Sequence, residues 1–123
     1  IFVIMESKYI HYQGKEIVYT DYRMKSPEEM VLTLNEAITF ISLLENKGIK
    51  YLHLIDLRGV PVTTEFAGTL IDQAKHHVGK SKSAILGITG IKRMFFKSYL
   101  FLSKSEMRSF QDKEQALQYL VSK

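Results

Sequence analysis

A helix with both ends marked begins near residue 26. Ser26 is a typical N-cap, Pro27 suits the first helical position, and Glu29 stands where a capping box needs an acidic side chain. Gly48 suits the left-handed backbone conformation that often follows the last residue of a helix. Between these ends, apolar residues recur at steps of three and four: Met30, Leu34, Ala37, Ile38, Ile41 and Leu44. The segment therefore predicts an amphipathic helix that buries one face.

Strand-like and helix-like segments alternate after this helix. Residues 51–57 and 83–87 are short runs that are apolar on both faces, as in central strands covered by helices. Three further helices are predicted. The first begins after Thr63 or Thr64, either of which can act as its N-cap, the second spans residues 91–102, and the third begins after Asp112. A short edge strand is predicted at residues 107–110. Strands separated by helices indicate right-handed crossovers and parallel pairing.

The first 21 residues favour strands instead. Runs at 2–5, 9–12 and 16–20 are rich in Ile, Val and Tyr, and Gln13-Gly14-Lys15 supplies a turn. We predict one α/β domain, residues 1–123. Its mixed sheet has four to five strands, with an antiparallel N-terminal hairpin and a parallel centre, packed by about four helices.

Composition argues against most catalytic classes. The chain has no cysteine, which excludes disulfides, thiolate zinc sites and cysteine nucleophiles. His76 and His77 are adjacent on a predicted helix and point about 100° apart, so they do not share a metal ion. Gly87-Ile88-Thr89-Gly90 lacks the spacing of a phosphate-binding glycine loop. We predict no enzyme activity, no metal and no cofactor.

The charge is uneven, with a net −1 over residues 1–61 and +5 over residues 62–123. The basic residues of the second half are scattered singly, which is more typical of a solvated surface than of a nucleic-acid interface. We expect no nucleic-acid partner. The longest apolar runs are a few residues, so we expect no transmembrane segment and a cytoplasmic location, although a chain that begins with Ile1 leaves a lost targeting segment open.

The predicted topology brings polar residues to one edge of the sheet. In an open α/β sheet, the loops at the carboxyl ends of parallel strands form the usual binding crevice. The residues expected there are Asp56, Arg58, Thr63, Thr64 and Glu65 after one strand, and Thr89, Gly90 and Lys92 after the next. Taken one at a time, several of these residues also fit a purely structural role: Asp56 braces its loop, Thr64 caps the helix and Glu65 interacts favourably with the positive end of the helix. As a group they form the candidate binding site.

The aromatic segment 91–102 is the second candidate. Phe96, Leu100 and Phe101 fall outside the apolar face of the predicted helix, and three cations lie between apolar residues. Three interpretations fit such a helix. It is buried on most sides in the core and a dimer contact, or it borders a partner groove or a hydrophobic ligand, or it lies on a membrane surface. A homodimer and a small hydrophobic ligand therefore stay open as alternatives.

The chain resembles the SpoIIAA-like branch of the STAS domains, named for sulfate transporters and anti-sigma-factor antagonists. The strand at 51–57 leading into the helix at Thr64, the strand at 83–87 and the closing segment 110–120 carry the likeness, and the opening hairpin also fits. The resemblance implies a mixed sheet packed with helices, no catalysis, and regulation through protein contacts. It also leaves open a carrier of a lipid-like ligand, by analogy with the similar CRAL-TRIO fold.

Signalling members of that family carry a phosphorylatable serine in an Asp-Ser pair at the start of the helix after the central strand. The matching stretch here is Thr63-Thr64-Glu65-Phe66, without Asp-Ser. Either Thr64 replaces the phosphoacceptor or Glu65 supplies a permanent negative charge. We expect a non-enzymatic, regulatory protein-interaction domain, with the carrier as the alternative function.

Overall fold

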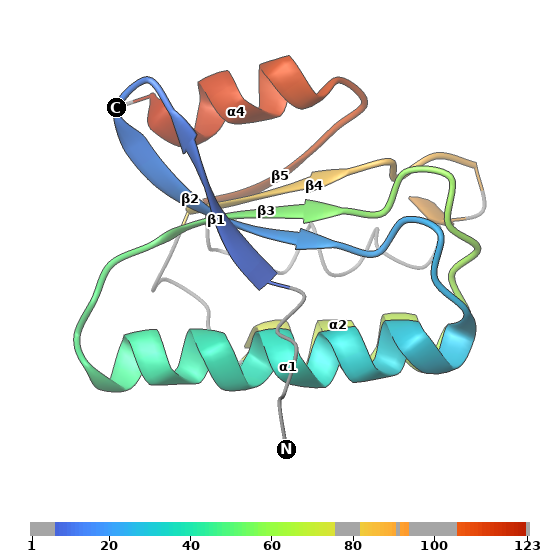
Figure 1. Ribbon diagram of the computed structural model, residues 1–123. Helices are drawn as coiled ribbons and strands as arrows, with labels where there is room; N and C mark the ends of the chain where they lie inside the picture. The colour runs from blue at the N-terminus through green and yellow to red at the C-terminus, as the bar shows by residue number, and fades with distance from the viewer. Residues whose placement is uncertain (1–6, 76–81, 91, 94–105, 123) are drawn as a thin grey trace.

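The described residues form a five-stranded mixed sheet with helices on both faces. The computed structural model describes residues 7–75, 82–90, 92–93 and 106–122 (Figure 1). The sheet order follows the chain: β1 (Ser7–Tyr12), β2 (Lys15–Asp21), β3 (Leu52–Asp56), β4 (Lys82–Leu86) and β5 (Glu106–Phe110). Strands β1 and β2 pair antiparallel and all other neighbours pair parallel. The predicted fold class is confirmed.

The hairpin turn is shorter than predicted. Gln13 and Gly14 both have positive φ, 49° and 77°, as a two-residue turn between right-twisted strands requires. Lys15, expected in the turn, instead begins β2 and pairs with Tyr12. The run at residues 2–5, expected to be either a separate strand or a bent continuation of the hairpin, lies outside the described residues.

Helix α1 (Pro27–Asn46) has the ends that the sequence indicates. The Ser26 side chain accepts a hydrogen bond from the Glu29 backbone N–H at 3.2 Å, and the Ser26 N–H donates to the Glu29 carboxylate at 2.9 Å. Gly48 follows the helix with φ of 70°. The predicted capping box and left-handed end are therefore confirmed.

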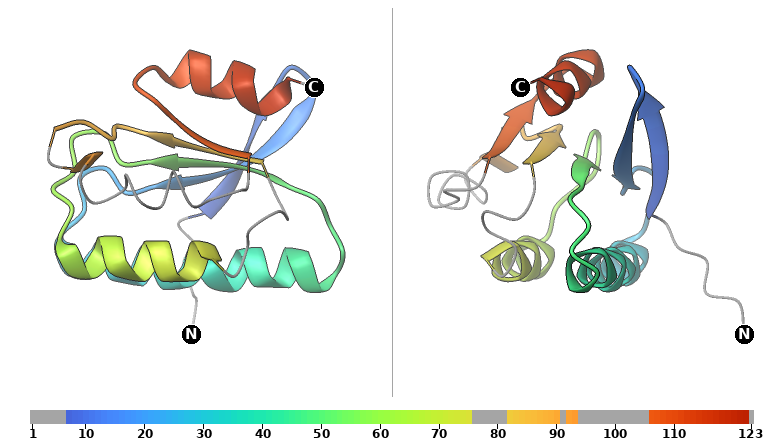
Figure 2. Two further views of the ribbon diagram at one scale, coloured as in Figure 1. Left: turned by 180° about the vertical axis from the view of Figure 1, so that it is seen from behind. Right: turned by 90° about the vertical axis from the view of Figure 1, so that its left-hand side faces the viewer.

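The helices form two layers. Helices α1 and α2 (Thr64–Lys75) lie side by side under one face of the sheet, and α4 (Lys113–Val121) lies on the other (Figure 2). Asp112 caps α4 by accepting from the Glu114 N–H. Most of the predicted helix at 91–102 lies outside the described residues. No helix within the described ranges is both long enough and apolar enough to cross a bilayer.

Each layer has its own apolar core. The core between the sheet and the helix pair contains Tyr22, Met30, Leu34, Ile55, Leu57, Val60, Phe66, Ala67, Leu70, Ile85 and Ile88. The core under α4 contains Ile17, Tyr19, Leu54, Ala84, Leu86, Ala116, Leu117 and Leu120. Because side chains alternate along a strand, Leu54 and Asp56 share the α4 face whereas Ile55 faces the helix pair. This alternation decides where the charged groups at the strand ends point.

Candidate functional site

The turns after β3 and β4 meet at the carboxyl ends of the parallel strands. The Leu57 N–H donates to the Leu86 carbonyl at 3.0 Å, and the Lys92 ammonium donates to the carbonyls of Leu57 at 2.8 Å and Gly87 at 3.3 Å. We call the segments 21–23, 56–65 and 87–92, as far as described, the carboxyl rim. The predicted adjacency of the turns after Leu57 and Gly87 is confirmed.

Lys92 ties these turns together from a half-buried position. Burial lowers the pKa of its ammonium group, because desolvation disfavours the charged form. The two carbonyl acceptors offset part of that cost, since they are the kind of partner that a partly buried ammonium needs. Lys92 therefore braces the rim, and its predicted part in binding stays a prediction.

Asp56 is the buried anchor of the rim. Its side chain is 0% exposed and accepts hydrogen bonds from the Arg58 backbone N–H at 3.2 Å, Arg58 Nε at 3.0 Å, Arg58 Nη2 at 2.8 Å and the Tyr19 hydroxyl at 2.6 Å. Burial by itself would raise the pKa of Asp56. The hydrogen bonds from Arg58 and Tyr19 outweigh burial and hold that pKa below its ordinary value. Asp56 is therefore a carboxylate at neutral pH.

The same arrangement recurs on the neighbouring strand. Asp21 accepts from the Arg23 backbone N–H at 3.0 Å and from Arg23 Nε and Nη2 at 2.9 Å each. Asp21 and Asp56 are register partners of β2 and β3, so the two Asp-x-Arg turns lie side by side. Arg23 Nε also lies 3.4 Å from Asp56 Oδ2. Our sequence reading missed Asp21 and Arg23, although the repeated Asp-x-Arg spacing at strand ends was a usable signal.

Two lysines approach the ring of Tyr19, which links the rim to the α4 face. Lys8 Nζ of β1 lies 5.9 Å from the ring centroid and Lys113 Nζ of α4 lies 4.8 Å from it. Burial and the bond to Asp56 raise the pKa of Tyr19, so its hydroxyl keeps the proton that it donates. We call Lys8, Arg23, Arg58 and Lys113 the cation cluster.

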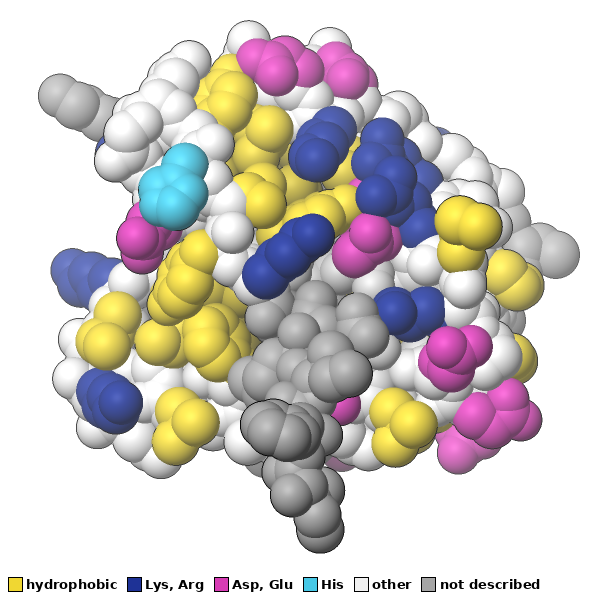
Figure 3. Space-filling view, in the orientation of Figure 1, with side chains coloured by type: hydrophobic (Ala, Val, Ile, Leu, Met, Phe, Trp, Pro, Cys, Tyr) yellow, Lys and Arg dark blue, Asp and Glu magenta, His cyan; other side chains and the backbone are white. Residues whose placement is uncertain are grey.

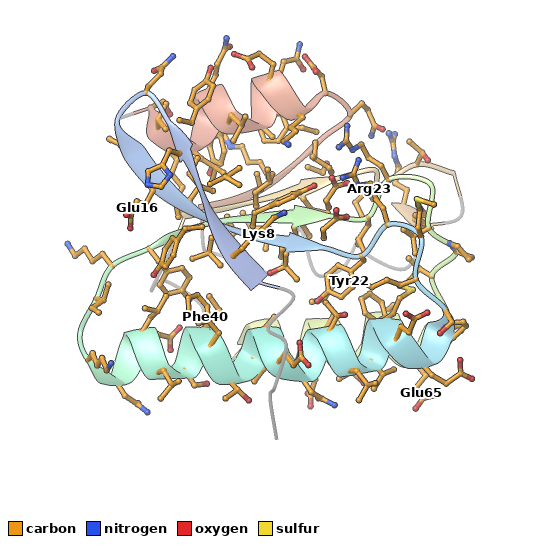
Figure 4. All side chains as sticks on the ribbon, in the orientation of Figure 1. Lys8, Glu16, Tyr22, Arg23, Phe40 and Glu65 are labelled. Atoms are coloured by element: carbon orange, nitrogen blue, oxygen red, sulfur yellow. The ribbon has the colours of Figure 1, made fainter. Side chains whose placement is uncertain are left out.

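The cation cluster is visible on the molecular surface. Figure 3 shows Lys and Arg side chains gathered between α4 and the strand ends, around apolar and acidic atoms. In the same orientation, Figure 4 places Lys8 over the sheet and Arg23 on the α4 side of the strand ends. The side chains of Arg23 and Arg58 are 43% and 34% exposed, so both remain accessible to solvent.

The other predicted site residues lie in two places: residues 63–65 are at the start of α2, and Thr89 and Gly90 are in the loop after β4. Thr63 caps α2, because its hydroxyl accepts from the Phe66 N–H at 3.1 Å, and Thr64 is the exposed first residue of that helix. Glu65 lies in the helix layer, under the sheet at this same end, whereas Arg23 lies above it (Figure 4). Thr89 and Gly90 are exposed on the rim. The sheet therefore separates residues 63–65 from the cation cluster.

Two further expectations concern other parts of the chain. Phe96, Leu100 and Phe101 lie outside the described residues, so the apolar contact surface stays a prediction. Within the described ranges, no group of three or more His, Asp or Glu side chains is arranged to hold a metal ion.

The two aspartates of the rim are poorly suited to act as general bases. A general base near neutrality needs a pKa close to the working pH, whereas Asp21 and Asp56 both have pKa values lowered by their arginines. Their oxygens already accept several hydrogen bonds. Comparison of the sequence with protein-family models and with curated proteins found no match.

Proposed function

We propose that this protein is a non-enzymatic, regulatory interaction domain of the STAS type, which binds another protein through its carboxyl rim. The observation that carries the proposal is the bracing of the rim before any partner arrives. Two Asp-x-Arg turns brace the ends of β2 and β3, and Lys92 ties the turn after β3 to the loop that carries the exposed Thr89 and Gly90. A surface held rigid in advance loses little conformational entropy on binding.

The start of α2 supplies a position for control by phosphorylation. Thr64 is exposed at the first helical position, and Thr63 already caps the helix. A phosphate on Thr64 would therefore leave the cap in place and would be tolerated by the positive helix end. It would add about two negative charges to the edge of the binding surface. An acidic partner would be repelled and a basic partner attracted.

The test compares matched variants in partner capture from an extract of the source cells. Thr64→Asp adds a charge, whereas Thr64→Asn has almost the same shape without it, and Glu65→Lys reverses the neighbouring charge. Thr89→Arg adds a large cation to the exposed loop after β4. We expect Thr64→Asp, Glu65→Lys and Thr89→Arg to change the captured proteins and Thr64→Asn to leave them as in the wild type. Equal thermal unfolding of all variants controls for folding.

Two results would overturn the proposal. One is an identical captured set for the wild type, Thr64→Asp, Glu65→Lys and Thr89→Arg. The other is a small hydrophobic molecule retained in native mass spectrometry of the purified protein, because a carrier and not an interaction domain would hold one. A mass increase near 80 Da on a peptide containing Thr64, after expression in the source cells, would support the phosphorylation step.

A further inference from the structure

The four cations of the cation cluster come from β1, the turns after β2 and β3, and α4, and they surround one small group of atoms. Asp56 Oδ2 lies 2.8 Å from Arg58 Nη2, 3.4 Å from Arg23 Nε and 2.6 Å from the Tyr19 hydroxyl. Both guanidinium groups thus touch the same oxygen atom. The ring of Tyr19 then connects that oxygen to the ammonium groups of Lys8 and Lys113.

The cluster has an excess of positive charge. Four cations surround two carboxylates, Asp21 and Asp56, both ionised at neutral pH. Like charges repel one another, and the fold holds these four cations around the Asp56–Tyr19 pair, beside an exposed surface (Figure 3). An anion with a charge of about −2 would neutralise the excess, and a phosphate monoester has that charge at neutral pH.

The arginines are oriented before a ligand binds. Each carboxylate engages Nε and Nη2 of its own arginine, which fixes the plane of the guanidinium and leaves the Nη1 N–H groups unused by Asp21 or Asp56. A fixed guanidinium fork matches the oxygens of a phosphate group and loses little side-chain entropy on binding. The lysines add mobile point charges at the border.

We infer that the cation cluster is a binding site for a phosphate monoester, contacted by Arg23, Arg58, Lys8 and Lys113. The ligand is either a free phosphate ester or a phosphorylated side chain of another polypeptide. The site shares Arg23 and Arg58 with the carboxyl rim but lies on the α4 side of the sheet, away from the start of α2. Its test is therefore independent of Thr64 and Glu65.

The experiment is an NMR titration of the full chain with three probes: inorganic phosphate, phenyl phosphate and a short phosphoserine peptide. Each has a control lacking the phosphate dianion: chloride at matched ionic strength, phenol and the unphosphorylated peptide. We expect saturable amide shifts confined to residues near 8, 21–23, 56–58 and 112–114. Similar affinities for phenyl phosphate and the peptide would identify free phosphate esters as ligands. At least tenfold tighter binding of the peptide would identify a phosphorylated polypeptide.

Variants separate a specific site from general attraction to a basic protein. Lys8→Gln combined with Lys113→Gln should weaken phenyl phosphate binding about tenfold, since each exposed ion pair contributes severalfold. Lys47→Gln combined with Lys50→Gln removes the same charge from exposed positions between α1 and β3 and should change affinity less than twofold. The inference is overturned if no probe gives saturable shifts, or if both double variants weaken binding equally.

Discussion

Gly87 lies close to the backbone of Leu57 and Arg58 in the carboxyl rim, and Gly87→Ala tests whether that close approach holds the rim together. Gly87 has φ of 88°, and a Cβ there would lie 2.6 Å from Arg58 Cα, 2.7 Å from Arg58 N and 2.9 Å from the Leu57 carbonyl carbon. All three atoms belong to the backbone, so no side chain can rotate away. The Gly87 N–H also donates to the Phe110 carbonyl at 3.2 Å, which restrains the residue from the other side.

Gly59 provides a control within the same rim. It also has a left-handed φ, 68°, but an added Cβ would meet nothing within 4 Å. The left-handed conformation costs about 1–2 kcal/mol for a residue with a side chain. Overlap with a fixed backbone adds about 1–3 kcal/mol. We therefore expect Gly59→Ala to lower the free energy of unfolding by about 1–2 kcal/mol and Gly87→Ala by about 2–5 kcal/mol.

Chemical denaturation with a shared m-value measures both free energies. A loss of this size is a large part of the roughly 5–15 kcal/mol typical of a single domain, so Gly87→Ala should also unfold at a visibly lower temperature than Gly59→Ala. The close approach would be refuted if the two variants differed by less than about 0.5 kcal/mol, because only the shared cost of positive φ would then remain.

Three further predictions concern the groups that brace the fold. Asp56→Asn should destabilise the protein by about 2–4 kcal/mol, because Arg58 loses its charged partner. The pKa of Asp56 is lowered in the folded protein, so its contribution to stability is fully present above the unfolded pKa of about 4 and is lost as the pH falls through the folded pKa. The free energy of unfolding, measured from pH 7 to pH 2, should therefore depend less on pH in Asp56→Asn than in the wild type. Parallel plots of that free energy against pH would contradict this. Ser26→Ala should lower the free energy of unfolding, measured by thermal unfolding, by about 1 kcal/mol, and Ser26→Gly should lower it by only a few tenths of a kcal/mol. Equal losses in the two variants would contradict the role of Ser26 as the N-cap. Lys92→Met should cost about 1–2 kcal/mol and speed hydrogen exchange at residues 57–59 and 87–90, and unchanged exchange would exclude the bridge.

The order of elements was predictable because its signals are local. The cap at Ser26, the left-handed residue at Gly48 and the cap at Asp112 each depend on a few neighbouring residues, and all three are as the sequence indicates. Parallel pairing followed from helical connections between strands. The choice between Thr63 and Thr64 as the cap of α2 needed coordinates, because both residues suit the position.

The candidate site was predictable only in part. Asp56 and Arg58 were found because they follow an apolar run, and their convergence with the turn at Gly87 followed from parallel topology. The register that sets Asp21 beside Asp56 depends on tertiary packing. So does the contact of Tyr19 with Asp56, since the two residues are 37 positions apart. The convergence of Lys8 and Lys113 on one ring needed both the hairpin and the last helix.

The electrostatics of the rim restrict how its binding can be controlled. The pKa values of Asp21 and Asp56 are lowered and those of Arg23 and Arg58 are raised, so each pair holds its charges across the neutral range. A small change of pH near neutrality therefore leaves these four charges as they are. The charge around these four groups changes when another group is added, either covalently at Thr64 or by a phosphate ligand at the cation cluster. These positions lie on opposite faces of the sheet, so both additions fit on one molecule. Because they are separated by a packed layer, their effects on partner binding should combine nearly independently.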